Sequence, residues 1–318
     1  MIPITEVVKG IFKIGPLETG NERTPDTCPY LIVGQEQALI WEPGEAGQVP
    51  ALLEGIRVLG VERDRIAYII PSHIHLHHCA GVPVLLKELP KATLMVHERG
   101  VPHLIDPTRL NESTFQVWGD GCPSITPVPQ DRIKGLAGGE VIDLGERKLD
   151  IIEAGGHAPH QVAMFDRLTK ALFPGDAAGA FNIPNNERAR PDILPPLFDV
   201  EQAVDALHRF QALKPTVILT FTRYGGISHS PEKTMRWAEE DYRAVERICR
   251  EGMKQKRNSL EIGAEVAEHY KKVRIATEME DRAGETTAPY GMCAYIHKQD
   301  PSLEMPRRPE GPLHGAQI

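Results

Sequence analysis

The stretch Pro71-Ser72-His73-Ile74-His75-Leu76-His77-His78 decides how this chain is interpreted, because it places four imidazoles within residues 73–78. The run 65–70 before it, which is Arg65 followed by five apolar or aromatic residues, predicts a buried strand, so the histidines follow a strand's C-terminal end, where sites in α/β proteins usually lie. Two histidines separated by one residue can share a metal ion, and burying several imidazoles without a metal or a partner is costly. The stretch therefore predicts a metal site.

The sequence on both sides of this stretch alternates between strand and helix patterns. Short β-rich runs at 7–14, 30–33 and 38–41 precede helical spacing from Val49 to Leu59. A second strand-rich region begins near Glu140, and helical patterns follow at 201–213, 231–251 and 259–272. Strands followed by helices in both halves predict two β-sheets packed face to face with helices outside, as one α/β domain over residues 1–273.

Residues 274–318 differ from the rest of the chain. They hold five prolines among charged residues and show little periodicity, which predicts an extended arm or a partly disordered tail. Because the segment also carries Tyr290, Met292, Tyr295 and Ile296, we expect an arm to pack across a partner subunit. We accordingly expect a homo-oligomer, such as a dimer.

Composition narrows the class of protein. The 318 residues are 41% hydrophobic and 25% charged, which is ordinary for a globular protein. With 36 basic against 44 acidic residues the net charge is −8, so nucleic acid is not an expected partner. No apolar run reaches 18 residues and the start does not resemble a signal peptide, which favours a cytoplasmic protein without a membrane partner. The five cysteines lack the spacing of a disulfide framework or a zinc knuckle.

Three blocks of this sequence resemble the metallo-β-lactamase superfamily. The run at 73–78 is similar to the family's H-x-H-x-D-H signature, Gly155-Gly156-His157-Ala158-Pro159-His160 to its G-H-x-P segment, and Phe173-Pro174-Gly175-Asp176-Ala177 to its strand-end G-D. The resemblance covers roughly residues 5–230 and places each block after an expected strand. It implies an α/β fold of the αββα four-layer sandwich type, with a metal site at one edge of the sheets.

The resemblance also implies roles for individual residues. His73, His75 and His157 match the ligands of the family's first metal, and Asp176 matches the carboxylate that bridges two metals. His78 matches a ligand of the second metal. The complete first set implies at least one bound metal ion.

Two departures from the family pattern both affect the second metal. His77 stands where the family has its Asp, and Arg223, in the turn 222–225, stands where the family has a late His. Together they remove one negative charge and add one positive charge, so a second dication is disfavoured. His229 is an alternative late ligand, or else a residue outside the metal's reach. We take His77 and Arg223 as candidate catalytic residues, and His77 also as a candidate ligand.

Other residues around these blocks have two open interpretations. Glu42 resembles a family acidic residue that orients a ligand histidine, or it is simply solvated. His160 either lines the pocket or lies on an exposed loop, and Gln161 stands where many relatives carry a further His. The stretch 182–196 is a candidate substrate loop or a plain connection.

Three functions remain open. The first is a hydrolase of an ester, lactone or thioester-type bond, in which the metal lowers the pKa of water from 15.7 to about 7 and Arg223 supplies positive charge to the oxyanion. The second is a mononuclear non-haem iron oxygenase, since imidazoles with one carboxylate also describe such sites. The third is a non-catalytic metal-binding relative. We favour the hydrolase, with a small-molecule substrate and one Zn²⁺ or Fe²⁺ ion rather than two.

Overall fold

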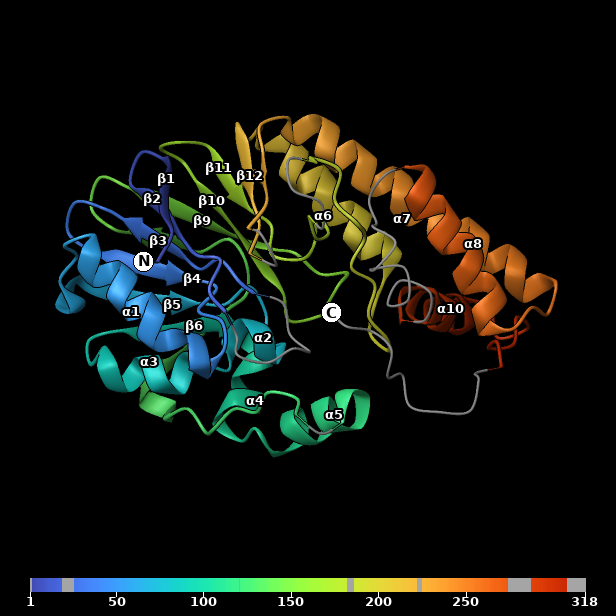
Figure 1. The fold of residues 1–318 in the computed structure, drawn as a ribbon, viewed down its shortest axis with the longest axis horizontal. Helices are drawn as coiled ribbons and strands as arrows, with labels where there is room; N and C mark the ends of the chain where they lie inside the picture. Colours follow the sequence, from blue (N-terminus) through green and yellow to red (C-terminus); the bar gives the residue numbers. More distant parts are fainter. Residues whose placement is uncertain are drawn as a thin grey trace.

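The computed structural model describes residues 2–18, 26–119, 121–181, 186–221, 225–273 and 287–307 (Figure 1). Within these residues the first sheet follows the order β1-β2-β3-β4-β5-β6-β7. Its strands are β1 Ile4–Val8, β2 Ile11–Ile14, β3 Tyr30–Val33, β4 Ala38–Trp41, β5 Ile66–Ile70, β6 Thr93–His97 and β7 Ile133–Leu136. Strands β1 to β4 pair antiparallel, whereas β4 to β7 pair parallel, so their carboxyl ends share one edge.

The second sheet follows the order β13-β12-β11-β10-β9-β8. Its strands are β8 Val141–Asp143, β9 Lys148–Glu153, β10 Val162–Asp166, β11 Ala171–Phe173, β12 Val217–Leu219 and β13 Ile227–Ser228. Neighbouring strands are antiparallel except β11 and β12, which are parallel. The parallel pair is joined through a long crossover that includes a helix, as parallel pairing requires.

Helices cover the outer face of each sheet (Figure 1). On the side of the first sheet lie η1 Ala46–Gln48, α1 Val49–Val58, η2 Arg63–Arg65, α2 Leu76–Cys79, α3 Val82–Glu88, η3 Glu98–Gly100, α4 Val101–Ile105, α5 Thr108–Trp118 and η4 Gln130–Arg132. On the side of the second sheet lie α6 Val200–Ala212, α7 Pro231–Lys254, α8 Ser259–Lys272 and α10 Thr287–Gln299. None of the helices in the described part of the chain is both long and apolar enough to cross a membrane.

Alternating side chains along the strands build three apolar layers. In β4, Leu39 and Trp41 point into the layer between the sheets, while Ile40 points into the layer beneath α1 and α3. In β11, Phe173 points between the sheets and Leu172 toward α6 and α7. The rings of Trp41 and Phe173 meet across the sheets at 5.9 Å. The order helix, sheet, sheet, helix confirms the αββα sandwich expected from the sequence.

The expected elements agree with the structure except in detail. Strands β3 and β4 and helix α8 have the expected bounds, and α1 begins at Val49. The run 7–14 is not one strand, because the chain reverses at Gly10 (φ +71°) and forms the hairpin of β1 and β2. The histidine stretch is not wholly a loop either, since His77 and His78 lie in the short helix α2.

The described C-terminal residues differ from the expected extended arm. Residues 287–299 form α10, and Pro289 is tolerated in its first turn, where a backbone N–H has no partner within the helix. Met292 and Ile296 are fully buried in the layer shared with α7 and α8 of the same chain, and Tyr295 is 6% exposed there. The extended arm is therefore wrong for 287–299. The division into 1–273 and 274–318, and the homo-oligomer, stay predictions.

Candidate metal centre

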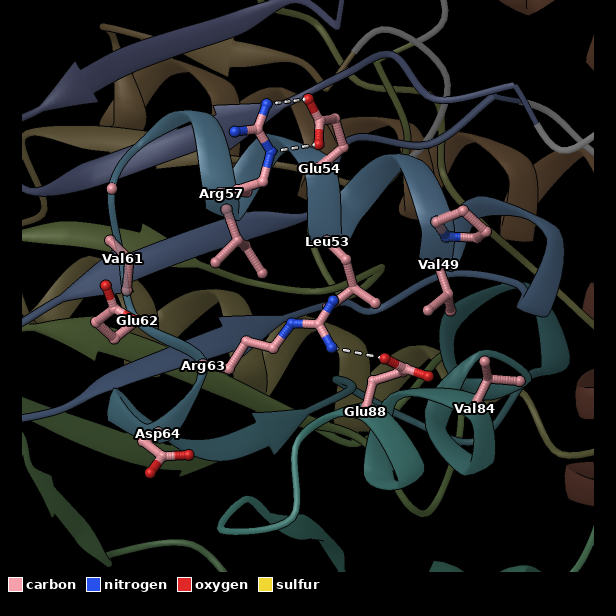
Figure 2. Close-up of a pocket in the computed structure, with 13 residues that line it drawn as sticks. Val49, Leu53, Glu54, Arg57, Val61, Glu62, Arg63, Asp64, Val84 and Glu88 are labelled. Atoms are coloured by element: carbon pink, nitrogen blue, oxygen red, sulfur yellow. Dashed lines mark hydrogen bonds and ion pairs between the residues drawn. The ribbon is translucent and has the colours of Figure 1, made fainter.

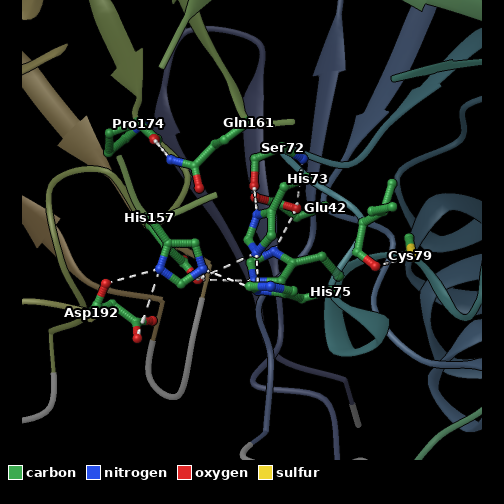
Figure 3. Close-up of polar contacts among 12 residues, drawn as sticks. Glu42, Ser72, His73, His75, Cys79, His157, Gln161, Pro174 and Asp192 are labelled. Atoms are coloured by element: carbon green, nitrogen blue, oxygen red, sulfur yellow. Dashed lines mark hydrogen bonds and ion pairs between the residues drawn. The ribbon is translucent and has the colours of Figure 1, made fainter. Parts of the chain in front are cut away.

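Polar side chains from both sheets converge at one edge of the sandwich (Figure 3). Glu42 follows β4, and His73 and His75 follow β5. His157 lies in the turn between β9 and β10, and Asp176 follows β11. His73, His157 and Asp176 are 0%, 2% and 3% exposed. The sandwich thus gathers residues that lie more than 130 positions apart, and the four assigned to a first metal are among them.

Three imidazoles face one another within hydrogen-bond range. Nε2 of His73 lies 2.8 Å and Nε2 of His157 lies 3.0 Å from Nδ1 of His75. Oδ2 of Asp176 lies 3.8 Å from Nε2 of His73 and 3.7 Å from Nε2 of His157. The atoms thus surround one point, and the three imidazoles form one of the groups that can hold a metal ion.

The hydrogen bonds behind these rings show that the donor set suits a metal. Nδ1 of His157 donates to the Asp192 carbonyl at 2.9 Å, which leaves Nε2 with a lone pair. Nδ1 of His73 lies 2.9 Å from the Ser72 hydroxyl. Nδ1 of His75 faces both of the other nitrogens but carries at most one proton, so it can donate a hydrogen bond to only one of them. A divalent cation would satisfy the converging lone pairs, so the residues fit a metal.

The electrostatics of the rings favour the same conclusion. Burial lowers the pKa of His73 and of His75 well below the usual value, and the neighbouring imidazoles lower it further. Both rings are therefore neutral at neutral pH. Neutral imidazole is the form that ligates a metal ion.

His78 lies in a different environment, between two carboxylates. Its Nδ1 lies 2.9 Å from Oε2 of Glu42 and its Nε2 lies 3.2 Å from Oδ2 of Asp176. Burial lowers the pKa of His78, but the two carboxylates outweigh burial and raise it to about 10. In return, the charge of His78 lowers the pKa of Asp176 against the effect of burial. Without a metal, His78 is a buried imidazolium.

Glu42 fixes this arrangement from the end of β4. Its side chain is fully buried and its backbone has φ +58°, an uncommon value for a residue with a side chain. Besides His78, Oε2 of Glu42 accepts from the Ser72 backbone N–H at 3.1 Å. The acidic residue expected to orient a ligand histidine thus contacts His78, the histidine assigned to the second metal.

The residues expected to distinguish this chain are less clearly placed. His77 is partly buried, and its ring lies 4.2 Å from that of His78, but it joins no metal-holding group among the described residues. Arg223 lies outside the described residues. His229 donates its backbone N–H to Oε1 of Glu187 at 2.7 Å, and its side chain joins none of those groups either. The ligand and catalytic roles of His77 and Arg223 stay predictions.

Two further residues border the centre. His160 is partly buried, and its ring is stacked on that of His73 at 6.2 Å, so it lies beside the centre rather than on an isolated loop. Gln161 is buried and donates to the Pro174 carbonyl at 3.4 Å (Figure 3). Gln161 therefore links the beginning of β10 to the end of β11.

Sequence reasoning missed Asp192. Its carbonyl holds His157, and its Oδ1 lies 3.9 Å from Nδ1 of His157. Ligand atoms of His157, Asp176 and Asp192 lie within 4.8 Å of one another. Burial raises the pKa of Asp192, His157 opposes the shift and Asp176 adds to it. Asp192 lies inside the candidate substrate loop, but no motif distinguishes it from other loop acids.

A hollow in the protein lies away from this centre (Figure 2). Residues of α1, η2 and α3 line it, including Val49 and Leu53, and the ion pairs Arg57–Glu54 at 2.7 Å and Arg63–Glu88 at 2.6 Å border it. Its lining contains none of the metal-centre residues. This hollow is therefore separate from the metal centre.

Comparison with known proteins gives a family match and several similar structures. Residues 29–222 match the model of the family described as the metallo-beta-lactamase superfamily. The metallo-beta-lactamase fold-containing protein ST1585 of Sulfurisphaera tokodaii is 32% identical over 168 residues, which cover 49% of this chain and 59% of that relative. The match thus spans less than two thirds of that relative's length.

Several solved structures are similar in fold to this chain. The archaeal protein ST1585 from Sulfolobus tokodaii has a TM-score of 0.60 at 25% identity, covering 73% of this chain and 85% of the other. The family protein TTHA1429 from Thermus thermophilus has a TM-score of 0.67 at 15% identity, covering 92% and 95%. The peroxy diiron species of the chemotaxis sensor ODP has a TM-score of 0.54 at 15% identity, covering 75% and 94%. The last two show a shared fold alone.

Proposed function

Because this chain belongs to the metallo-beta-lactamase superfamily, we propose that it is a metal-dependent hydrolase that cleaves an ester, lactone or thioester-type bond in a small molecule. One observation carries the proposal: the nitrogens of His73, His75 and His157 converge beside the carboxylate of Asp176. When bound there, Zn²⁺ or Fe²⁺ acts as a Lewis acid and activates water at neutral pH.

The side chains of this centre are held before any metal binds. The Asp192 carbonyl orients the ring of His157, and the Ser72 hydroxyl lies against the ring of His73. Such outer contacts fix the tautomer and the direction of a ligand ring. Asp176 adds a carboxylate on one side of the imidazoles, where it can accept a hydrogen bond from a reacting water.

We propose one tightly bound metal rather than two. His77 supplies no negative charge where the family has a carboxylate, and both ring nitrogens of His78 face carboxylate oxygens. His78 has to give up a proton before its Nε2 can offer a lone pair to a metal, which weakens a site that includes it. We further propose that Arg223 stabilises the developing oxyanion, since a guanidinium stays charged at any working pH.

A mononuclear iron oxygenase is the second candidate. Three imidazoles with one carboxylate suit Fe²⁺ as well as Zn²⁺. A non-catalytic metal-binding protein remains the third. These three candidates differ in what they consume.

A substrate panel with two readouts separates them. The purified protein, loaded with Zn²⁺ or anaerobically with Fe²⁺, is offered esters, lactones and thioesters, with product release and oxygen uptake measured together. The proposal expects turnover without oxygen uptake, abolished by a chelator and by Asp176→Asn. Oxygen uptake coupled to turnover would establish the oxygenase instead. Stoichiometric metal without turnover across the panel would favour the non-catalytic relative.

A further inference from the structure

Asp192 is held firmly beside the metal centre. Its loop is tied to α7 by Arg188, which donates twice to the fully buried carboxylate of Asp241, at 2.8 and 2.7 Å. The same loop pairs with the chain after β11 through two backbone hydrogen bonds between Ala180 and Arg190, at 2.9 and 2.8 Å. The chain leading to Asp192 is therefore tied to α7 and to the segment after β11.

The carboxylates of Asp192 and Asp176 lie close together, with His78 as the counter-charge of Asp176 and Arg190 acting electrostatically on Asp192. Their ligand atoms lie within 4.8 Å of each other, and their side chains are 26% and 4% exposed. Among the described residues, no lysine or arginine forms an ion pair with either carboxylate, and the ion-pair partner of Asp192 is His157, at 3.9 Å. Two partly buried carboxylates repel each other unless a cation or proton lies between them.

His78 already contacts Asp176. Nε2 of His78 lies 3.2 Å from Oδ2 of Asp176, and Glu42 holds the other ring nitrogen of His78. His77, in place of the family's Asp, offers no carboxylate there. Asp192 brings one negative charge back to the centre, from the loop between β11 and α6.

We infer that Asp192 and Asp176 hold a second divalent cation, displaced from the family's usual second position toward the loop of Asp192. The inference rests on the proposed function for its first metal, because Asp176 lies between the two positions. The ligand atoms of Asp192 belong to the group with Asp176 and His157, and not to the group of His73, His75 and His157. Two carboxylates favour a hard cation such as Mn²⁺ or Mg²⁺, with water completing its shell. With fewer protein ligands, the second cation binds more weakly than the first.

Manganese titration of the full chain tests this inference. The protein, carrying its tightly bound metal, is titrated with Mn²⁺ while free Mn²⁺ is followed by electron paramagnetic resonance. Wild type should bind one further Mn²⁺, and Asp192→Asn should weaken that binding about 10-fold or more while keeping the tight metal. Asp192→Glu should retain most of the binding because it keeps the carboxylate. Asp205→Asn, which removes an exposed carboxylate on α6, is the matched control.

The outcomes separate this inference from the proposed function. If wild type takes up no further Mn²⁺, or if Asp192→Asn binds it as wild type does, the second position is wrong. If His78→Gln weakens the Mn²⁺ binding and Asp192→Asn does not, the cation lies at the family's usual position and the inference is overturned. If wild type lacks the tight metal itself, the proposed function fails. Circular dichroism of each variant confirms that the fold is intact.

Discussion

Two groups of histidines flank Asp176, and they differ in what holds them. Nδ1 of His73 contacts a hydroxyl and Nδ1 of His157 contacts a backbone carbonyl, both of them neutral partners, and burial lowers the pKa of His73. His78 lies between two carboxylates, which raise its pKa to about 10. A histidine side chain is thus suited to bind a metal in the first group and to carry a positive charge in the second. The partners behind each ring decide which.

Removing a ring from the neutral group should have the largest effect. His157→Ala takes away a nitrogen that faces His75 at 3.0 Å, so we expect the bound metal to fall from about one equivalent to near zero. Elemental analysis after dialysis measures this. His208→Ala, an exposed histidine paired with Glu239 on the surface, is the control and should keep the metal. Equal metal content in both variants would rule out His157 as a ligand.

Restoring the family's Asp at position 77 and its late His at position 223 should make a second metal site resemble the first. The double variant His77→Asp with Arg223→His adds a carboxylate and removes a guanidinium, a change of two charge units in favour of a second dication. We expect the tightly bound metal to rise toward two equivalents and the native activity to change. A double variant that keeps the wild-type stoichiometry would show that other residues exclude the second metal.

Removing one of the two carboxylates around His78 should change how the free energy of unfolding depends on pH. Because the folded pKa of His78, about 10, lies above the unfolded value of 6.5, its contribution is complete below pH 6.5 and is lost as pH rises through 10. Glu42→Gln removes one of the two carboxylates. We expect it to lower the unfolding free energy of the metal-free protein at pH 6 by about 3 kcal/mol and less at pH 10.

Urea unfolding of the chelator-treated protein at both pH values gives this difference. Glu62→Gln changes an exposed carboxylate and serves as the control. A loss for Glu42→Gln that is the same at pH 6 and pH 10 would contradict the charged state of His78.

Removing a neutral contact behind a ligand should have the smallest effect. Ser72→Ala deletes the hydroxyl that lies 2.9 Å from Nδ1 of His73 but leaves the ring in place. We expect metal affinity to fall about 10-fold, as is usual when a group that orients a ligand is lost. Competition with a chromogenic chelator measures the change. Unaltered affinity would show that packing alone orients His73.

Much of the fold could be predicted from local patterns. Strands β3 and β4 and helix α8 follow hydrophobic periodicity with clear bounds, and the order of strands and helices is enough to indicate two covered sheets. Residues 287–299 could not be interpreted in this way, because Pro289 and Gly291 are poor helix formers and tertiary packing of Met292 and Ile296 stabilises the helix.

The metal centre was only partly predictable for a related reason. His73, His75, His157 and Asp176 stand in recognisable motifs, whereas Asp192 comes from an irregular loop whose position depends on Arg188 and Asp241. The charged state of His78 was also hidden, since it depends on a contact with Glu42 across 36 residues. Pairings at such separations depend on the completed sandwich.

The number of tightly bound metals tests the central claim most directly. The account predicts that the full chain, purified without chelator and dialysed against metal-free buffer, carries about one equivalent of Zn or Fe by elemental analysis. X-ray absorption of that metal should show imidazole ligands that are lost in His73→Ala. A reproducible two equivalents, with His77 and His78 seen as ligands, would contradict the account.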